Sequence, residues 1–549
     1  MRKATGMTSS GAAGSPPSAL ASVARHPWYI ALAVLLIAII VLVALWDWNW
    51  FKGPVERQVE SRTGRSFDIG GDLDVDLGRV TRIRADALRF GNADWSKDPT
   101  MASADRLEFG IEVWPLLLHR QVRIPDIHLD TPRLRLEQGP KGVGNWVFGS
   151  QGGTEPAFGR LWIDDGRLRF IDAAAKTDID IKVDSAAPGK GEAAPPMDAS
   201  GGGRWKGNPF TVRGHAQSPL ALRDEQQPYR IDVHAQAGTT RAHARGTLLD
   251  PLQLRDFDLK LALSGSNLEE LYPLLGIAMP TSPPYAFDGR FTRERKGGNT
   301  IWHYDGFTGK VGDSDLAGKT ALTTGGPRPY LRGDLVSKRL DFDDLAVFIG
   351  KAPKANGGES TNPALAAQAA RESARTRVLP DTPYDLHKLR AMDADVRWKA
   401  QRINAPKLPL DDMDAHLKLE NGLLQLVPLD FGVAGGNIRS TIRMDARESP
   451  ISTHADVTLQ ALNLGELMPE RKLIKEAIGK VGGTVDLRGR GNSIAKMLAS
   501  SSGDVAIGMG RGQISNMVVE LAGLDVEEAV KFLIEGDRRI PIRCAFGDF

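Results

Sequence analysis

The segment from Gly312 to Thr320 comes nearest to a reactive motif, because Gly318-Lys319-Thr320 ends like a loop that wraps nucleotide phosphates. Such a loop needs another glycine five residues before Gly318, so that backbone amides can converge on the phosphate. Asp313 occupies that position, and its carboxylate and that of Asp315 would repel a phosphate group. The segment therefore argues against nucleotide binding.

Three aspartates, Asp72, Asp74 and Asp76, have the spacing with which a calcium-binding loop begins. The twelfth position of such a loop carries a glutamate that binds the ion with both oxygens, but Ile83 stands there. The residues between the aspartates are apolar, and this alternation is typical of a β-strand with one wet face. We therefore interpret the segment as a strand.

The remaining reactive side chains form no recognisable site. Of the 10 histidines, His234 and His243 flank an Ala/Gly/Thr turn, and we interpret them as ordinary surface or strand residues because no metal-ligand spacing accompanies them. The single cysteine, Cys544, lacks the partner that a disulfide, redox or zinc site needs. Neither G-x-S-x-G nor H-E-x-x-H occurs. The sequence thus predicts a protein that is not an enzyme and has no cofactor.

Composition narrows the class of partner. The 549 residues include 70 Lys and Arg and 68 Asp and Glu, which leaves a formal charge of only +2. A nearly neutral chain has no net positive field that would attract nucleic acid. The 59 glycines and 33 prolines favour many turns between short strands over a few long helices. We therefore expect no nucleic-acid partner and a body built mainly of strands.

An uncharged, apolar stretch of 19 residues runs from Trp28 to Trp46. As a helix it would extend about 28 Å, close to the roughly 30 Å of a bilayer's hydrocarbon core. Basic residues precede it and Asp47 follows it, so the positive-inside rule predicts a cytoplasmic N-terminus. A cleaved signal peptide would instead have a shorter apolar core and a cut site of small residues. The sequence predicts a disordered cytoplasmic tail over residues 1–27, a transmembrane helix over residues 28–46, and a body outside the cytoplasm.

Beyond this stretch, apolar residues recur at every second position, which is the period of strands with one apolar face. The alternation is clearest at Leu107/Phe109/Ile111/Val113, Ile179/Ile181/Val183, Leu259/Leu261/Leu263, Leu417/Leu419 and Val457/Leu459. Glycine and Asn or Asp punctuate such runs, as hairpins require, at Asp165-Gly166, Asn421-Gly422 and Gly435-Gly436-Asn437. These patterns predict a mainly β (α+β) fold, in which an elongated, curved antiparallel sheet carries a few short helices.

A short unit occurs three times in the chain. Each time, an alternating strand is followed by an Asn or Asp that can cap a brief helix with acidic residues in its first turn, at 267–271, 341–345 and 463–467. Residues 351–377 contain almost no large apolar side chain, which predicts a flexible linker. We therefore expect one β domain over residues 47–350 and another over residues 378–549.

The predicted strands offer more apolar surface than the short helices can cover. Two sheets could close on each other as a sandwich, or one curved sheet could leave its apolar face as a groove for acyl chains, and periodicity alone does not choose between them. Side chains two apart on a strand point the same way. The candidate groove residues nearest the apolar stretch are therefore Leu73, Val75, Leu77, Leu107, Phe109, Ile111 and Val113.

The segment after the apolar stretch is similar to the N-terminal region of the AsmA family of Gram-negative envelope proteins. The blocks that carry the resemblance are Asp47-Trp48-Asn49-Trp50, Gly53-Pro54-Val55, Thr63-Gly64-Arg65, Ile69-Gly70-Gly71-Asp72-Leu73, Asn92-Ala93-Asp94-Trp95, Asp105-Arg106-Leu107-Glu108-Phe109, Pro132 and Asn145-Trp146. The similarity is densest over residues 47–175 and extends to about Asp537. Family members usually continue beyond the segment that matches residues 540–546, so the C-terminal domain is expected to be truncated.

The resemblance implies a bacterial inner-membrane protein, anchored by residues 28–46, with a periplasmic body. In that family a chorein-like apolar groove is thought to carry phospholipid towards the outer membrane, so the acyl chains of phospholipids are an expected partner. An alternative is an envelope factor that influences the assembly or targeting of outer-membrane proteins without transporting lipid, with outer-membrane assembly components as partners. No catalytic residue comes with either function.

Overall fold

The structure is a computed structural model that describes residues 27–548 except for short internal stretches. These exceptions are residues 45, 140–141, 149–156, 188–194, 219–220, 222–227, 250–255, 276–278, 280–281, 347–380, 382, 406–408, 468–478 and 516–538. The predicted linker over residues 351–377 and residues 1–26 of the predicted tail lie outside the described residues.

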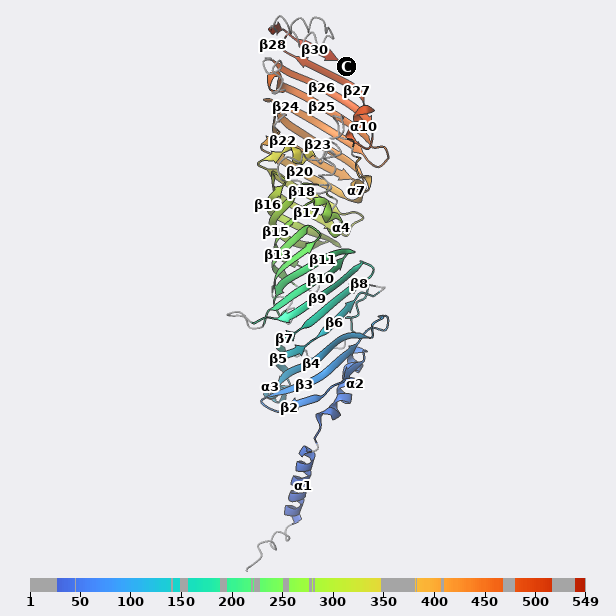
Figure 1. The fold of residues 1–549 in the computed structure, drawn as a ribbon, viewed down its shortest axis with the longest axis vertical. Helices are drawn as coiled ribbons and strands as arrows, with labels where there is room; N and C mark the ends of the chain where they lie inside the picture. Colours follow the sequence, from blue (N-terminus) through green and yellow to red (C-terminus); the bar gives the residue numbers. More distant parts are fainter. Residues whose placement is uncertain are drawn as a thin grey trace, which may run out of the picture.

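The described chain begins with helix α1 (Pro27–Ala44), which lies at one end of the elongated molecule, apart from the sheet (Figure 1). The predicted helix is therefore present, whereas its insertion in a membrane stays a prediction. Among the described residues, we find no helix that combines the length and the apolarity needed to cross a membrane.

The aromatic segment after α1 docks onto the first strands through two side chains. The carboxamide oxygen of Asn49, in η2 (Trp48–Phe51), accepts a hydrogen bond from the Leu73 amide at 2.9 Å. In α2 (Lys52–Thr63), Glu56 Oε1 accepts from the Ile69 amide at 3.0 Å. Helix α2 ends at Gly64, whose φ of 67° suits a residue without a Cβ. These contacts fix where the chain enters the sheet.

One 26-stranded sheet forms the body of the described chain. Up to the parallel junction described below, its strands are β1 (Phe67–Ile69), β2 (Leu73–Asp76), β3 (Val80–Gly91), β4 (Thr100–Glu112), β5 (Arg123–Asp130), β6 (Arg133–Glu137), β7 (Ala157–Asp164), β8 (Gly166–Asp172), β9 (Thr177–Ser185), β10 (Met197–Trp205), β11 (Asn208–Ala216), β12 (Tyr229–Ala237), β13 (Thr240–Leu249), β14 (Asp256–Gly265), β15 (Tyr285–Lys296), β16 (Asn299–Val311), β17 (Ser314–Thr324) and β18 (Tyr330–Ser337).

The sheet continues with β20 (Asp393–Ala400), β22 (Leu410–Glu420), β23 (Leu423–Val433), β24 (Gly436–Asp445), β25 (Ser452–Asn463), β26 (Lys480–Arg490), β27 (Ser502–Met509) and β30 (Ala545–Asp548). Two small pairs lie beside it, formed by β19 (Leu340–Asp341) with β21 (Ile403–Asn404) and by β28 (Gly512–Ser515) with β29 (Arg539–Ile542). The short helices α3 (Val113–His119), η4 (Leu268–Glu270), α4 (Leu271–Leu275), α5 (Phe342–Ala346), α7 (Leu386–Ala391), α8 (Leu464–Leu467) and α10 (Ile494–Ala499) interrupt the strands.

The pairing of the sheet departs from the predicted antiparallel pattern. Most neighbours are antiparallel, but β5 with β7, β6 with β8 and β18 with β20 are parallel, so the sheet is mixed. Each parallel step follows a long connection, over residues 138–156 or 338–392, and only a connection of a dozen or more residues lets the next strand run in the same direction.

The Asp165-Gly166 signal predicted a hairpin, but the structure has a kink there instead. Strands β7 and β8 flank Asp165, whose φ is 49°, and they run side by side with β5 and β6 in the same direction. A positive φ therefore bends one continuous line of strand at this point. By contrast, Asn421 and Gly422, with φ values of 49° and 80°, form the predicted tight hairpin between β22 and β23.

Strands on both sides of the predicted linker belong to one sheet, because β18 pairs with β20 over its whole length. Residues Arg328 and Asp393 join the two sides with hydrogen bonds of 3.1 Å from the guanidinium to both carboxylate oxygens. The division into domains at 47–350 and 378–549 stays a prediction.

All three predicted capping units form short helices. Asn267 caps η4 by accepting from the Glu269 amide at 3.0 Å, and Asp341 accepts from the Asp343 amide at 3.0 Å before α5. Helix α8 directly follows Asn463. The antiparallel pairs and the one parallel pair between them make β14, β18 and β25 run in the same direction, so the three helices that follow these strands lie at the same ends of the strands. Helices α7 and α10 lie at the opposite ends.

Among the described residues, one tightly buried apolar cluster lies within the first strands, at Ile69, Leu73, Ala85 and Leu88, and the other four lie where the short helices meet the strand ends. Leu268 and Leu271 pack on Tyr285 beside η4, and Met497 of α10 packs with Ile451 at the opposite ends of the strands. Further clusters surround Leu340 and Leu462. Beyond the first strands, the dry packing is thus concentrated along the two rims of the sheet.

Candidate functional site

The predicted groove residues mostly share one face at the N-terminal end of the sheet. Leu73 and Leu107 both pair with Ala85, and Val75 and Phe109 both pair with Ile83. Ile111 pairs with Thr81 on the same face. Directly paired residues on neighbouring strands point to the same side of a sheet, so the register brings these five predicted residues together.

The other two predicted residues lie outside the strands. Leu77 follows the last residue of β2 and is 71% exposed, and Val113 is the first residue of helix α3. The alternating pattern extends one step beyond each strand because the chain turns at Gly78 in one case and enters a helix in the other. Neither side chain is part of the apolar face of the sheet.

The apolar face continues along the sheet, strand after strand. One row of directly paired residues, all apolar or glycine, comprises Phe90, Ala102, Leu134, Leu168, Ile181, Gly201, Val212, Ala235, Ala242, Leu263, Phe287 and Gly309. One row crosses the parallel junction and comprises Leu331, Ala394, Leu419, Leu424 and Met444. A second row lies beyond the junction and comprises Val396, Leu417, Leu426, Ile442, Ala455 and Leu487. We call this surface the apolar face.

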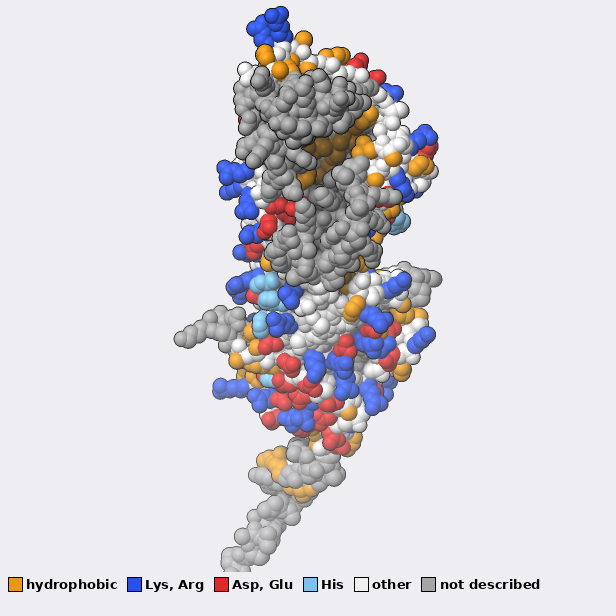
Figure 2. Space-filling view, turned by 45° about the horizontal axis from the view of Figure 1, so that its top comes forward, with side chains coloured by type: hydrophobic (Ala, Val, Ile, Leu, Met, Phe, Trp, Pro, Cys, Tyr) orange, Lys and Arg blue, Asp and Glu red, His pale blue; other side chains and the backbone are white. Residues whose placement is uncertain are grey.

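Side chains in the middle of the apolar face are half-buried rather than sealed. Val396, Leu417, Ile442 and Leu487 all have intermediate exposure, and Ile507 is 38% exposed. In the part of the chain that the structure describes, the only other sheets are the two-stranded pairs β19–β21 and β28–β29, and Leu340 and Ile403 of the first pair pack on this face at its rim, against Ala400 and Met413. Figure 2 shows hydrophobic side chains lining a hollow in the upper half of the molecule. The choice between an open groove and a closed sandwich stays a prediction, and the described residues show one large sheet whose apolar face is half-buried at its middle.

An aromatic cluster in the middle of the apolar face was missed by the sequence reasoning. Phe257, Phe291 and Trp302 lie within 6.0 Å of one another by ring centroids, and Tyr304 stacks on Phe307 at 5.1 Å. The Tyr304 hydroxyl donates to the Leu261 carbonyl at 3.0 Å, and burial raises its pKa. The alternation of aromatic residues within β15 and β16 is the sequence signal that could have revealed the cluster.

The opposite face of the sheet is covered by charged side chains paired across neighbouring strands. Arg84 contacts Glu108 at 3.3 Å, and Arg290 contacts Asp258 at 2.8 Å. Arg167 donates to both oxygens of Asp180, at 2.7 and 2.6 Å, and this hydrogen bonding lowers the pKa of the Asp180 carboxyl. Exposed pairs of this kind add little stability, but they keep this face wet. The sheet thus separates an apolar face from a polar one.

The segments that resembled phosphate and calcium loops are parts of this sheet. Residues 314–324 form β17, and the amides of Asp313 and Ser314 donate to Asp344 Oδ2 at 3.1 and 2.9 Å. The Ser314 hydroxyl donates to the same oxygen at 2.6 Å. A carboxylate of the protein therefore takes the position at this turn that a phosphate would need. Asp74 lies on the polar face, 3.9 Å from Arg84.

Asp344 should make folding pH-dependent. Burial raises its pKa to about 6, against an ordinary value near 3.9 in the unfolded chain, so the folded state binds more protons between these two values. The free energy of unfolding should therefore fall as the pH rises from about 4 to about 6, by on the order of 3 kcal/mol. Asp344→Asn, which keeps an accepting oxygen, should remove this slope.

The pH slope can be measured by urea denaturation at several pH values, with hydrogen exchange reporting on the β16–β17 hairpin. Asp343→Asn is the matched control, because Asp343 lies in the same helix but is less buried. An unchanged slope in Asp344→Asn, or an equal loss in Asp343→Asn, would contradict the assignment.

Comparison with known proteins identifies a family over nearly the whole described chain. The sequence model of the AsmA family matches residues 27–189 and 197–548. The chain is 32% identical to AsmA family protein YhjG of Escherichia coli (strain K12) over 561 aligned positions, which cover 94% of this chain and 81% of that protein. No solved structure matches the chain. The match includes α1, the strands of the apolar face and the three capped helices, and the chain therefore belongs to the AsmA family.

Proposed function

We propose that this chain is a membrane-anchored protein of the bacterial envelope that binds phospholipid acyl chains along the apolar face and conveys them between the inner and outer membranes. The observation that carries the proposal is the continuity of that face from β2 to β30. Membership in the AsmA family supports a location in the cell envelope.

A continuous apolar path is what an acyl chain needs to move through water. Each exposed CH₂ group costs roughly 0.8 kcal/mol relative to an apolar environment, so a gap of even one polar strand would hinder movement. Three of the 26 strands lie end to end with another strand and do not lengthen the sheet in the direction across the strands. The other strands lie side by side at about 4.8 Å, so the apolar path across them is roughly 100 Å long. The charged pairs of the opposite face keep the body soluble outside the bilayer.

Crosslinking at neighbouring residues on opposite faces tests this proposal. A photoreactive amino acid at Phe109, on the apolar face, should crosslink phospholipid when the full-length chain is irradiated in its native membrane. The same amino acid at Glu108, which pairs with Arg84 on the polar face, should give no lipid adduct. Equal adducts at both positions, or none at either, would refute a lipid path along this face.

The alternative of an assembly factor makes a different prediction in the same experiment. A protein that acts on outer-membrane proteins without carrying lipid should give protein adducts, not lipid adducts, from Phe109. The mass of the adduct, measured by mass spectrometry, distinguishes the two functions.

The anchor belongs to the proposal as well. We place residues 28–46 across the inner membrane, with the N-terminus in the cytoplasm and the body in the periplasm, because α1 contains no charged residue and basic residues precede it. A reporter enzyme that folds only in the periplasm should be active when fused after Phe51. The matched fusion after Arg25 should be inactive. Activity in the reverse pattern would overturn the proposed orientation.

A further inference from the structure

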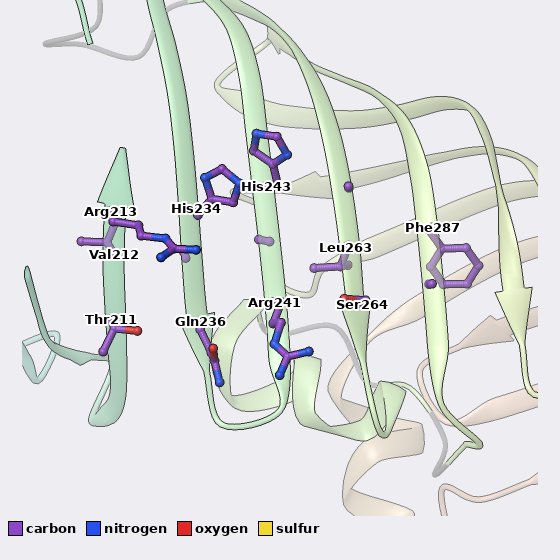
Figure 3. A pocket seen from close by; sticks show the side chains of 14 residues that line it. Thr211, Val212, Arg213, His234, Gln236, Arg241, His243, Leu263, Ser264 and Phe287 are labelled. Carbon is purple, nitrogen blue, oxygen red and sulfur yellow. The ribbon is translucent and has the colours of Figure 1, made fainter. Parts of the chain in front are cut away.

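The polar face carries a pocket formed by strands β11 to β15 (Figure 3). The side chains of His234 and His243 lie side by side at one end of it, on the neighbouring strands β12 and β13. The two residues are direct partners in the β12–β13 register, and their rings stack with centroids 3.8 Å apart and planes at 12°. Both histidines are strand residues, as predicted. Their direct pairing could not be predicted, because the sequence alone does not give the register of β12 and β13.

A carboxylate completes the group. Asp232 lies two residues before His234 on β12 and so points to the same face. Its Oδ1 atom is 2.7 Å from His243 Nε2 and 4.0 Å from His234 Nδ1. One donor atom from each residue lies within 4.8 Å of the other two. Two imidazoles and one carboxylate therefore converge on a single volume.

Two imidazole nitrogens and one carboxylate oxygen are a donor set that late first-row transition ions prefer. Zinc binds histidine nitrogen at about 2.0–2.1 Å and carboxylate oxygen at about 2.0–2.2 Å, most often with four ligands. Small rotations of the exposed side chains bring the three donors from their present separations to those of a tetrahedral ion. Water or an anion supplies the fourth ligand.

The second oxygen of Asp232 has its own partner. Arg245, the direct partner of Asp232 in the β12–β13 register, has its Nε atom 3.7 Å from Oδ2, the oxygen that does not contact His243. A partner on the outer oxygen orients a metal-binding carboxylate and leaves its inner oxygen free to bind the ion.

We propose that Asp232, His234 and His243 form a binding site for a zinc-like divalent transition ion on the outer, polar face of the sheet. This site does not depend on the lipid function proposed above, because it lies on the opposite face from the apolar residues. Its place on two rigid, paired strands fixes the spacing of the donors without help from any loop.

The surroundings of the site favour an anion as the fourth ligand. Arg213 and Arg241 also line the pocket, and neither forms an ion pair with any residue that the structure describes. Their charge opposes a bare cation but attracts the anion that a zinc ion with three protein ligands still binds. A metal carrying hydroxide or a small carboxylate would satisfy both the donors and the arginines.

A second group of donors provides an internal comparison. His454 and Asp456 of β25 and Asp486 of β26 each offer one donor atom, and these three atoms lie within 4.8 Å of one another. This group has one imidazole and two carboxylates, and Arg488 Nε lies 3.9 Å from an Asp486 oxygen. Having fewer nitrogen donors, it should bind zinc more weakly than the first group.

Zinc titration of the full-length chain in detergent tests the proposal. The protein should be purified without a polyhistidine tag, stripped with a chelator and titrated with zinc chloride in a calorimeter. We expect one strong equivalent, and His234→Ala, His243→Ala and Asp232→Asn should each weaken it by about tenfold or more. Asp232→Asn is nearly isosteric, so it keeps the test valid if an alanine variant fails to fold.

His416→Gln is the matched control. His416 Nε2 lies 2.7 Å from Asp395 on a neighbouring strand, which reproduces the His243–Asp232 contact without a second histidine. This variant should keep the full zinc affinity. Unchanged affinity in all three site variants would overturn the proposal, as would loss of the strong equivalent in His454→Ala alone, which would assign it to the second group.

Discussion

Replacing Val457 with aspartate should strip most of the bound phospholipid from the purified chain, whereas the same replacement at Thr458 should leave it in place. The two residues are neighbours on β25 and have nearly the same shape. Val457 pairs with Val485 on the apolar face, and Thr458 pairs with Arg439 on the polar face. The comparison therefore changes the face that receives the charge and little else.

The expected size of the effect follows from the cost of placing a carboxylate beside acyl chains. An unpaired charge is strongly disfavoured in an apolar environment, and a penalty of even 2 kcal/mol lowers occupancy by about thirtyfold. Val457 is half-buried, so without lipid its replacement can be solvated and the sheet should remain folded. Bound lipid can be quantified by mass spectrometry of extracts from equal amounts of each variant.

Circular dichroism separates this result from the outcome of a closed, dry core. If the apolar face around Val457 were sealed, the aspartate would unfold this region and the β-sheet signal would fall together with the lipid. If Val457→Asp stays folded and keeps its lipid, the acyl chains do not pass through this part of the apolar face. Loss of lipid from Thr458→Asp alone would place the path on the wrong side of the sheet.

The alternating residues predicted the strands well because a period of two reflects local geometry. Val457 and Leu459 belong to β25 as expected, and the Asn421-Gly422 hairpin forms because its positive φ values suit that pair of residues. Capping by Asn267 was likewise predictable, since the side chain and the amide it accepts from are two residues apart. Features set by neighbours in sequence could thus be predicted from the sequence.

Features set by distant residues could not. The parallel pairing of β18 with β20 depends on how residues 338–392 cross between them, and no local signal specifies that path. The meeting of His243 with Asp232 depends on the β12–β13 register. The choice between a groove and a sandwich likewise depended on whether a second sheet covers the first, which alternation cannot reveal.

We expect the truncation of Leu340 to alanine to cause the largest loss of folding stability of any single side-chain truncation, because Leu340 packs where the two parts of the sheet meet. Leu340 is fully buried in β19, where it packs against Ala400, Ile403 and Met413 from strands beyond the parallel junction. Its amide donates to the Arg402 carbonyl at 2.9 Å. Truncating a buried leucine to alanine leaves a cavity and costs about 2–5 kcal/mol. Leu340→Ala should therefore destabilise the contact between the two parts of the sheet.

This loss should remain local, because in an elongated sheet each strand contacts only its neighbours and stability adds from one strand to the next. Hydrogen exchange should accelerate in β18, β20 and β22 of Leu340→Ala and stay unchanged in β3 and β4, which lie far along the sheet.

Val336→Ala is the matched control, since Val336 is 42% exposed on the adjoining strand and its truncation should lower the free energy of unfolding by less than about 0.5 kcal/mol. Faster exchange spread evenly over the whole sheet would contradict this view, because it would mean that the strands unfold as one cooperative unit. If the change stays local, opening at Leu340 would interrupt the apolar face midway along the proposed lipid path, and the variant should retain lipid adducts at Phe109 while moving less lipid past the junction.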